Sequence, residues 1–76
     1  MTRFDSARAR EAIRYLESLG FAQARKEGRH KFFRHRDGRT AAIPDHRGEY
    51  LGRGILSKVL RDAGMAPQQF LAWLSR

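Results

Sequence analysis

The stretch FAQARKEGRHKFFRHRDGRTAAIP, residues 21–44, decides the fold, because it contains every strand candidate of the chain and its strongest turn signals. At its centre, Gly28-Arg29-His30 forms the turn between two short basic segments, and Asp37-Gly38 is a strong hairpin signal further on. The predicted strands are residues 21–26, 30–36 and 40–43. Joined by two tight turns, they predict a three-stranded antiparallel meander.

Alternation along the second strand divides its side chains between two faces. His30, Phe32, Arg34 and Arg36 fall on one face, and Lys31, Phe33 and His35 on the other. If the His30 face is open, Phe33 belongs to the core and Phe32 borders the site, where an aromatic ring could stack on a base. The alternative is that both phenylalanines are core. His35 is predicted to be a surface residue.

Helical patterns flank these strands. Residues 6–19 carry an apolar stripe at helical spacing, with Asp5 or Ser6 as the cap and Gly20 as the left-handed stop. After a polar loop over residues 45–52, a second helix runs to Gly64, with the apolar positions Ile55, Leu56, Val59, Leu60 and Ala63. Pro67 begins a short third helix, whose Phe70, Leu71, Trp73 and Leu74 are expected to close the core. The order predicts one α+β domain over residues 1–76, with helices covering one face of a small sheet.

The composition points to an acidic partner. The chain has 16 Lys and Arg against 8 Asp and Glu, and a net charge of +8. Residues 21–39 hold seven of the basic side chains and only Glu27 and Asp37 in opposition, hence five of the eight net charges. Such a concentration favours a polyanion such as nucleic acid. A solvated Arg-rich surface without functional meaning and an acidic protein partner are the alternatives.

Other classes of protein are disfavoured. There is no cysteine, so neither disulfides nor thiolate metal sites are expected. No apolar run approaches the ~20 residues of a membrane span, and the polar start lacks the apolar stretch of a secretory signal. We therefore expect a cytoplasmic protein without membrane contact.

His30 is the candidate for chemistry. A histidine, with an ordinary pKa near ~6.5, can take the proton of a ribose 2′-hydroxyl, which then attacks the adjacent phosphate. Positioned acid–base catalysis of this kind contributes roughly 10²–10⁴-fold. Nearby cations would stabilise the charge on the phosphate, and Arg25, Arg29 and Lys31 are nearest in sequence. The alternative is an ordinary strand histidine bonded to backbone.

Several short motifs follow one another in a characteristic order. They are Leu19-Gly20-Phe21, Arg25 and Gly28-Arg29-His30; Asp37-Gly38-Arg39 and Ile43-Pro44-Asp45-His46; Gly54-Ile55-Leu56 and Val59-Leu60-Arg61-Asp62-Ala63-Gly64; and Phe70. Together, over residues 9–71, they resemble HicA-type toxins, including that family's Gly-Phe … Arg … Gly-Ser-His signature, its hairpin and its Pro-x-His. One position departs from the signature, because Arg29 stands where the family commonly has Ser.

The resemblance implies a domain shaped like double-stranded-RNA-binding domains. It implies the toxin of a type II toxin–antitoxin pair, an endoribonuclease (mRNA interferase) that cuts messenger RNA without metal or cofactor and is inhibited by a HicB-type antitoxin. The family's catalytic histidine corresponds to His30, and His46 would line the substrate. DNA would be contacted, if at all, only through the antitoxin complex. The residues expected to bind RNA are Arg25, Lys26, Gly28, Arg29, Lys31, Phe32 and Arg34.

Three alternatives to this function stay open. The same fold and charge would suit a non-catalytic binder of double-stranded RNA, or an adaptor whose basic face docks an acidic protein. Residues 60–70 read locally like a helix-turn-helix with Gln68 and Gln69 as base readers, although that segment lacks basic residues. A metal site from His30, His35, Asp45 and His46 fits no known ligand spacing.

Overall fold

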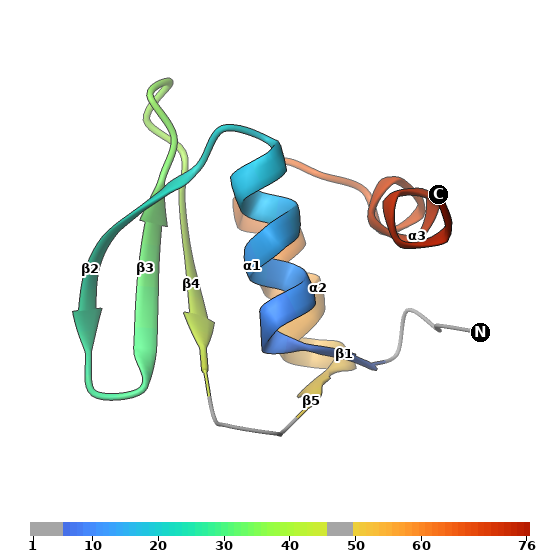
Figure 1. Ribbon diagram of the computed structural model, residues 1–76, viewed down its shortest axis with the longest axis horizontal. Coiled ribbons are helices and arrows are strands. Elements are labelled where there is room, and N and C mark those ends of the chain that lie inside the picture. Colours follow the sequence, from blue (N-terminus) through green and yellow to red (C-terminus); the bar gives the residue numbers. More distant parts are fainter. Residues whose placement is uncertain (1–5, 46–49) are drawn as a thin grey trace.

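The computed structural model describes residues 6–45 and 50–76 and shows an α+β domain, as the sequence predicts (Figure 1). In chain order the elements are β1 (Ser6–Arg8), α1 (Ala9–Ser18), β2 (Ala22–Glu27), β3 (His30–Arg34), β4 (Thr40–Pro44), β5 (Tyr50–Gly52), α2 (Arg53–Asp62) and α3 (Pro67–Ser75). None of the helices in the described segments is long and apolar enough to cross a membrane.

The meander is confirmed. Strands β2, β3 and β4 form an antiparallel sheet in that order, and β1 pairs with β5 in a separate two-stranded sheet. The β2–β3 turn consists of Gly28 and Arg29, so Glu27 pairs with His30. Gly28 has φ +59°, which suits the first loop position of a type II′ turn. The second hairpin is wider than predicted, because β3 ends at Arg34 and a five-residue loop follows.

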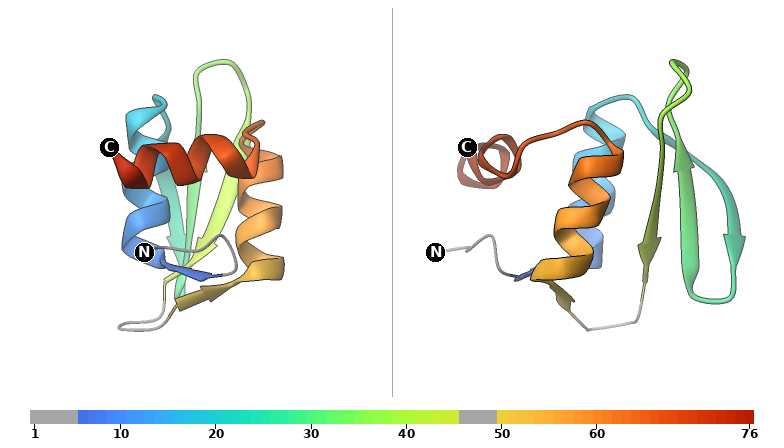
Figure 2. Two further views of the ribbon diagram at one scale, coloured as in Figure 1. Left: turned by 90° about the vertical axis from the view of Figure 1, so that its right-hand side faces the viewer. Right: turned by 180° about the vertical axis from the view of Figure 1, so that it is seen from behind.

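The elements stack in layers. Helices α1 and α2 lie side by side on one face of the β2–β3–β4 sheet, and α3 crosses over them on the side away from the sheet (Figure 2). Strand β4 lies nearest to the helices, whereas all six residues of β2 are exposed. The β2–β3 hairpin therefore projects beyond the helix layer, and within the described residues no element covers the outer face of the sheet.

The core lies between the sheet and helices α1 and α2, and Phe70 of α3 joins it from the other side of these helices. Phe33, Ile43, Leu16, Leu56 and Phe70 are its largest buried side chains, each at most 1% exposed. Phe33 is thus core as predicted, while Phe32 on the outer face is only half-buried. The predicted stops of α1 and α2 are confirmed by Gly20 and Gly64, which have φ +102° and +75°.

The predicted start of the first helix was wrong. Ser6 belongs to strand β1, Asp5 lies outside the described residues, and α1 begins at Ala9. The carboxylate of Glu11 accepts a hydrogen bond from the Arg8 backbone N–H at 2.9 Å, which satisfies one orphan donor of the helix start. The extra strand forms because Ala7 pairs with Leu51, and both side chains are buried.

Because of the same pairing, the prediction that residues 45–52 are all loop was wrong. Its last three residues form β5, which leads into α2. Ile55, predicted as part of the apolar stripe of this helix, is 46% exposed. The other four predicted positions of the stripe are buried, so the buried face of α2 is narrower than its pattern indicated.

His35 is not the surface residue that the sequence predicted. Its Nε2 donates to the Leu19 carbonyl at 3.0 Å, its Nδ1 accepts from the Asp37 N–H at 3.1 Å, and its ring meets Phe21 edge-on. Arg39 completes the anchor by binding the Asp37 carboxylate and donating to the Ala63 carbonyl at the end of α2. The backbone N–H of Arg39 and then its guanidinium hold the pKa of Asp37 below its usual value. These contacts fix the β3–β4 loop to the ends of both helices.

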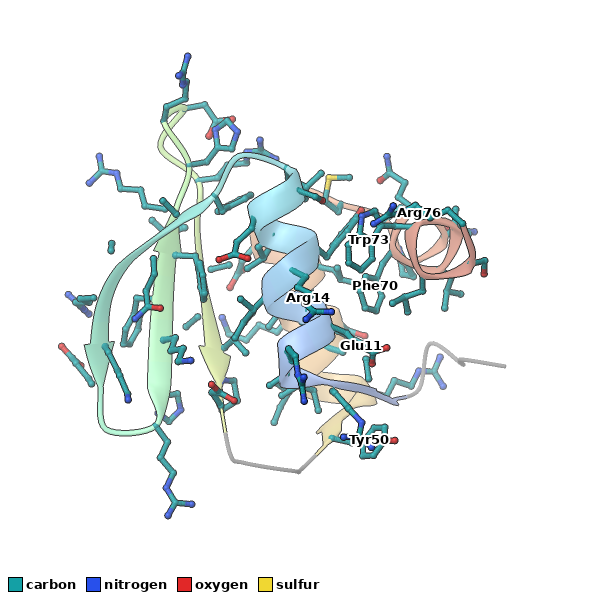
Figure 3. The ribbon with its side chains drawn as sticks, in the orientation of Figure 1. Glu11, Arg14, Tyr50, Phe70, Trp73 and Arg76 are labelled. Atoms are coloured by element: carbon teal, nitrogen blue, oxygen red, sulfur yellow. The ribbon has the colours of Figure 1, made fainter. Side chains whose placement is uncertain are left out.

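The third helix is held by aromatic packing. Phe70 and Trp73 point from α3 toward α1, where Tyr15 lies 5.0 and 5.2 Å from their ring centroids (Figure 3). The Arg76 guanidinium lies 4.7 Å from the centroid of Trp73. Burial raises the pKa of Tyr15. Of the four apolar residues predicted to close the core from this helix, Phe70 is fully buried and the others are half-buried.

Candidate active site

His30 is the first residue of β3 and lies exposed at the end of the sheet where the β2–β3 turn is formed. Its cross-strand partners are Glu27 in β2 and Pro44 in β4. Alternation along β3 puts His30, Phe32 and Arg34 on the outer face, opposite buried Phe33. The imidazole therefore lies on an open cationic surface that a long polymer could reach.

Arg25 belongs to this outer face as well, because the register pairs it with Phe32. Its Cζ lies 4.3 Å above the centroid of the Phe32 ring, and its Nε lies 3.3 Å from a carboxylate oxygen of Glu27. Arg34, at the other end of the strand, is exposed, and no ion pair involves it within the described residues. Three of the residues predicted to bind RNA thus share one face with His30.

Lys26 and Lys31 belong to the opposite face. The register pairs them with each other, so two lysines stand directly opposite each other across the hairpin. Lys31 is half-buried, and its Nζ lies 2.6 Å from a carboxylate oxygen of Asp45, which offsets the repulsion between like charges. Lys26 is exposed on the projecting hairpin. Of these two predicted contacts, Lys26 is the more accessible to an outside anion.

The turn itself brings the remaining predicted residues beside His30. Gly28 has a left-handed backbone, and no atom lies within 4 Å of a Cβ placed there, so its surroundings are open. The carbonyl of Arg29 accepts a hydrogen bond from the Asp45 N–H at 2.6 Å. The end of β4 is therefore tied to the turn, and the position of His30 is fixed from both neighbouring strands.

Glu27 is a site residue that the sequence reasoning missed. In an antiparallel pair, residues directly opposite each other have Cβ atoms about 4.5–5.5 Å apart, so Glu27 and His30 are neighbours on one face. The signal was available in the sequence, because a two-residue loop made of Gly28 and Arg29 requires this pairing. The side chain of Glu27 thus starts on the face that carries His30, and its carboxylate forms an ion pair with Arg25 of the same strand.

Two other predictions concern residues elsewhere. His46, predicted to line the substrate, lies outside the described residues. In the part of the chain that the structure describes, no three His, Cys, Asp or Glu side chains form a metal-binding group. The helix-turn-helix alternative needs Gln68 and Gln69 as base readers. Gln69 Oε1, however, accepts a hydrogen bond from the Ala66 N–H at 2.7 Å and so caps α3. Only Gln68 is left to read a base.

Comparison with known families gives one match. The family model described as the HicA toxin of bacterial toxin–antitoxin systems matches residues 9–65, about three quarters of the chain. The match runs from α1 through α2 and contains the whole β2–β3–β4 sheet with His30, while β1 and α3 lie outside it. Comparison with curated proteins gives no match. The chain belongs to the HicA toxin family and is a toxin of a bacterial toxin–antitoxin system.

Proposed function

We propose that this toxin is an endoribonuclease of a type II system that cleaves messenger RNA with His30 as the acid/base group, in the cytoplasm. The observation that supports the proposal is the position of His30 on an exposed face together with Arg25 and Arg34. A histidine buried for structural reasons would resemble His35, which has two hydrogen bonds and an aromatic neighbour. Among the interactions of the described residues, His30 has none of these.

The proposed reaction needs no group beyond the protein and the RNA. A base takes the proton of the ribose 2′-hydroxyl, and the 2′-oxygen forms a bond to the adjacent phosphorus. The bond from phosphorus to the 5′-oxygen breaks, and an acid supplies the proton of the leaving 5′-hydroxyl. The products are a 2′,3′-cyclic phosphate and a 5′-hydroxyl end. Guanidinium groups near the phosphate stabilise the charge that develops on it.

Glu27 is the second titratable group that the register places at the site. One proton must be removed and another supplied, and His30 and Glu27 together can perform both transfers. In this scheme Arg25 keeps the carboxylate of Glu27 in position through their ion pair. A Glu27→Gln variant should then cleave RNA more slowly than the unaltered protein in excess EDTA.

The test of the proposed function is RNA cleavage by purified protein in excess EDTA, with the His30→Ala variant beside it. We expect cyclic-phosphate ends from the unaltered protein, a rate about 10²–10⁴-fold lower from the variant, and similar RNA affinity for both. His35→Ala is an unsuitable control, because it removes the contacts of His35 with Leu19, Asp37 and Phe21; Arg14→Ala on the exposed side of α1 is a better one. Equal cleavage by His30→Ala would contradict the proposal.

The main alternative is an RNA-binding module without catalysis. It would use the same cationic face, and it predicts intact RNA with both proteins while binding is retained. As a toxin of a toxin–antitoxin system the chain has an antitoxin partner. We propose that this partner is of the HicB type and covers the face that carries His30. Such a protein would then protect RNA from cleavage, and it would compete with RNA for binding to the His30→Ala variant.

A further inference from the structure

The face of the sheet that carries His30 also has a hollow that neither the acid–base chemistry nor the family match explains. It has a volume of about 250 Å³ and is open to solvent. It is lined by Ala24, Arg25, Phe32, Phe33, Arg34 and Thr40. Pockets for drug-sized ligands measure about 300–1,000 Å³, so this hollow suits a smaller group, the size of one ring system.

A β-bulge shapes the hollow. The register between β2 and β3 shifts between Gln23 and Arg25, which leaves Ala24 without a partner across the hairpin. Bulges often lie next to active sites, where they redirect side chains. Here the unpaired residue has a small side chain, so the sheet surface between Arg25 and Arg34 is not filled. The bulge also resets the alternation, so that Ala22 and Arg25 both lie on the outer face.

The chemistry of the lining matches a nucleobase with its phosphate. The Arg25 guanidinium lies over the Phe32 ring, with its Cζ 4.3 Å from the centroid, and its Nε forms an ion pair with Glu27. Unpaired RNA bases stack on aromatic rings and on guanidinium planes of this kind. Arg34 adds a cation for a phosphate, and the Thr40 hydroxyl, directly across from it, can donate to or accept from a base edge.

The location relates the hollow to the scissile bond. Phe32 lies two residues along β3 from His30 on the same face, a distance of about 7 Å. That is roughly the reach of one nucleotide along a single strand. A base held at Phe32 would therefore belong to the nucleotide adjoining the phosphate at His30.

We propose that this hollow is a subsite for one unpaired RNA base, which makes the protein select single-stranded RNA. The proposal rests on the proposed function, since it names the substrate class of the same site. A double-stranded segment cannot fill the hollow, because its bases are paired and stacked and its deep groove excludes side chains. Selection of single strands is thus expected despite a fold shaped like that of double-stranded-RNA binders.

The test uses the His30→Ala protein, so that RNA stays intact, and a short single-stranded RNA in which one nucleotide at a time is made abasic. We expect one abasic position to weaken binding by about 5- to 100-fold, the range of a lost base–aromatic stack. Adding Phe32→Leu should cause a similar loss with normal RNA and no further loss with that abasic RNA. Phe32→Tyr, which keeps the ring, should bind within about 2-fold of the parent protein.

Charge and partner class need their own controls. Arg34→Met should weaken binding more than Arg14→Met, which removes the same charge from exposed α1. Duplex RNA of the same sequence should bind more weakly than the single strand. A polyglutamate peptide that bound as tightly as the RNA and lost the same factor with Phe32→Leu would assign the hollow to an acidic protein instead.

The outcomes separate the two proposals. A flat abasic scan, or equal affinity of duplex and single strand, overturns the base subsite even if the unaltered protein cleaves RNA in EDTA. Conversely, the subsite is supported if binding is weakened at one abasic position and this effect is lost in Phe32→Leu. If no cleavage is observed in that case, only the catalytic proposal fails. Because the abasic scan changes the RNA and not the protein, the result does not depend on whether a variant folds.

Discussion

His30 and His35 lie five residues apart but have opposite surroundings. His30 is exposed at the start of β3, while the side chain of His35 is 16% exposed and uses both ring nitrogens in hydrogen bonds. Since the carbonyl of Leu19 can only accept, Nε2 carries the proton and Nδ1 accepts from Asp37 N–H. Its ring is thus held in a structural position. We therefore assign the proposed chemistry to His30 and a structural role to His35.

This division predicts reciprocal effects of two substitutions. His35→Ala should lower the free energy of unfolding by about 1–3 kcal/mol, because the Leu19 carbonyl and the Phe21 ring lose their partner. His30→Ala should change it by less than about 0.5 kcal/mol, as expected for an exposed residue. Urea denaturation followed by circular dichroism measures both. A larger destabilisation by His30→Ala than by His35→Ala would show that the roles are reversed.

Tyr15 gives a second prediction at this scale. Burial between α1 and α3 raises its pKa above the ordinary 10.0. The neutral phenol therefore contributes stability that is fully present below pH ~10 and is lost as pH rises through the folded-state pKa. Tyr15→Phe should unfold less readily than the unaltered protein in that alkaline range, relative to their difference at pH 7. Urea midpoints measured from pH 7 to 11 test this, and parallel curves for the two proteins would contradict it.

At the scale of elements, the sequence predicts well those structures whose determinants are local. The meander follows from alternation and from Gly28 and Gly38, and α2 follows from a helical stripe that ends at a left-handed glycine. Strands β1 and β5 were missed because neither carries a strand pattern of its own. They form because Ala7 and Leu51, 44 positions apart, are buried together. Such pairing depends on tertiary packing, which overrides the helix propensity of residues 6–8.

The same contrast between local patterns and tertiary contacts applies to the residues of the site. Alternation correctly separated Phe32 from Phe33 and kept His30 with Arg34 on one face. It could not show that Lys31 is paired with Asp45, or that Arg39 is a structural side chain bound to Asp37 and Ala63. Those contacts join segments that only the folded chain brings together. The charge of a residue is visible in the sequence, but its partner is not.

Helix α3 lies beyond the family match, and its contribution to stability can be measured. Phe70 is fully buried and contacts Tyr15, so Phe70→Ala should cost about 3–5 kcal/mol. A domain of 76 residues has a total stability of about 4–11 kcal/mol, so this single change should remove at least about a quarter of it. Gln68→Ala on the exposed side of the same helix is the control, with an expected effect within about 0.5 kcal/mol. Similar unfolding midpoints for the two variants would show that α3 is dispensable.

At the scale of the whole molecule, the net charge of +8 is larger than the positive charge of the surface that would bind RNA. Arg39 is bound to Asp37, Lys31 to Asp45 and Lys58 to Asp62. The exposed arginines of α1 belong to a helix that lies on the opposite side of the sheet from its outer face. The exposed cations of the β2–β3 hairpin are Arg25, Lys26, Arg29 and Arg34, and three of them, all except Lys26, belong to the outer face or to the turn beside it. The binding surface is therefore a small part of the charged surface.

That distribution predicts a modest dependence of RNA affinity on salt. Each phosphate contact with single-stranded RNA contributes about −0.7 to the slope of log affinity against log salt. Three or four contacts give a slope of about −2 to −3, whereas contacts with all eight net charges would give about −6. The measurement is a salt titration of His30→Ala protein with a short single-stranded RNA. Arg34→Gln should make the slope shallower by about 0.7, and Arg14→Gln should leave it unchanged. A slope near −6, or equal effects of the two variants, would mean that RNA wraps the whole molecule and that the outer sheet face is not a localised site.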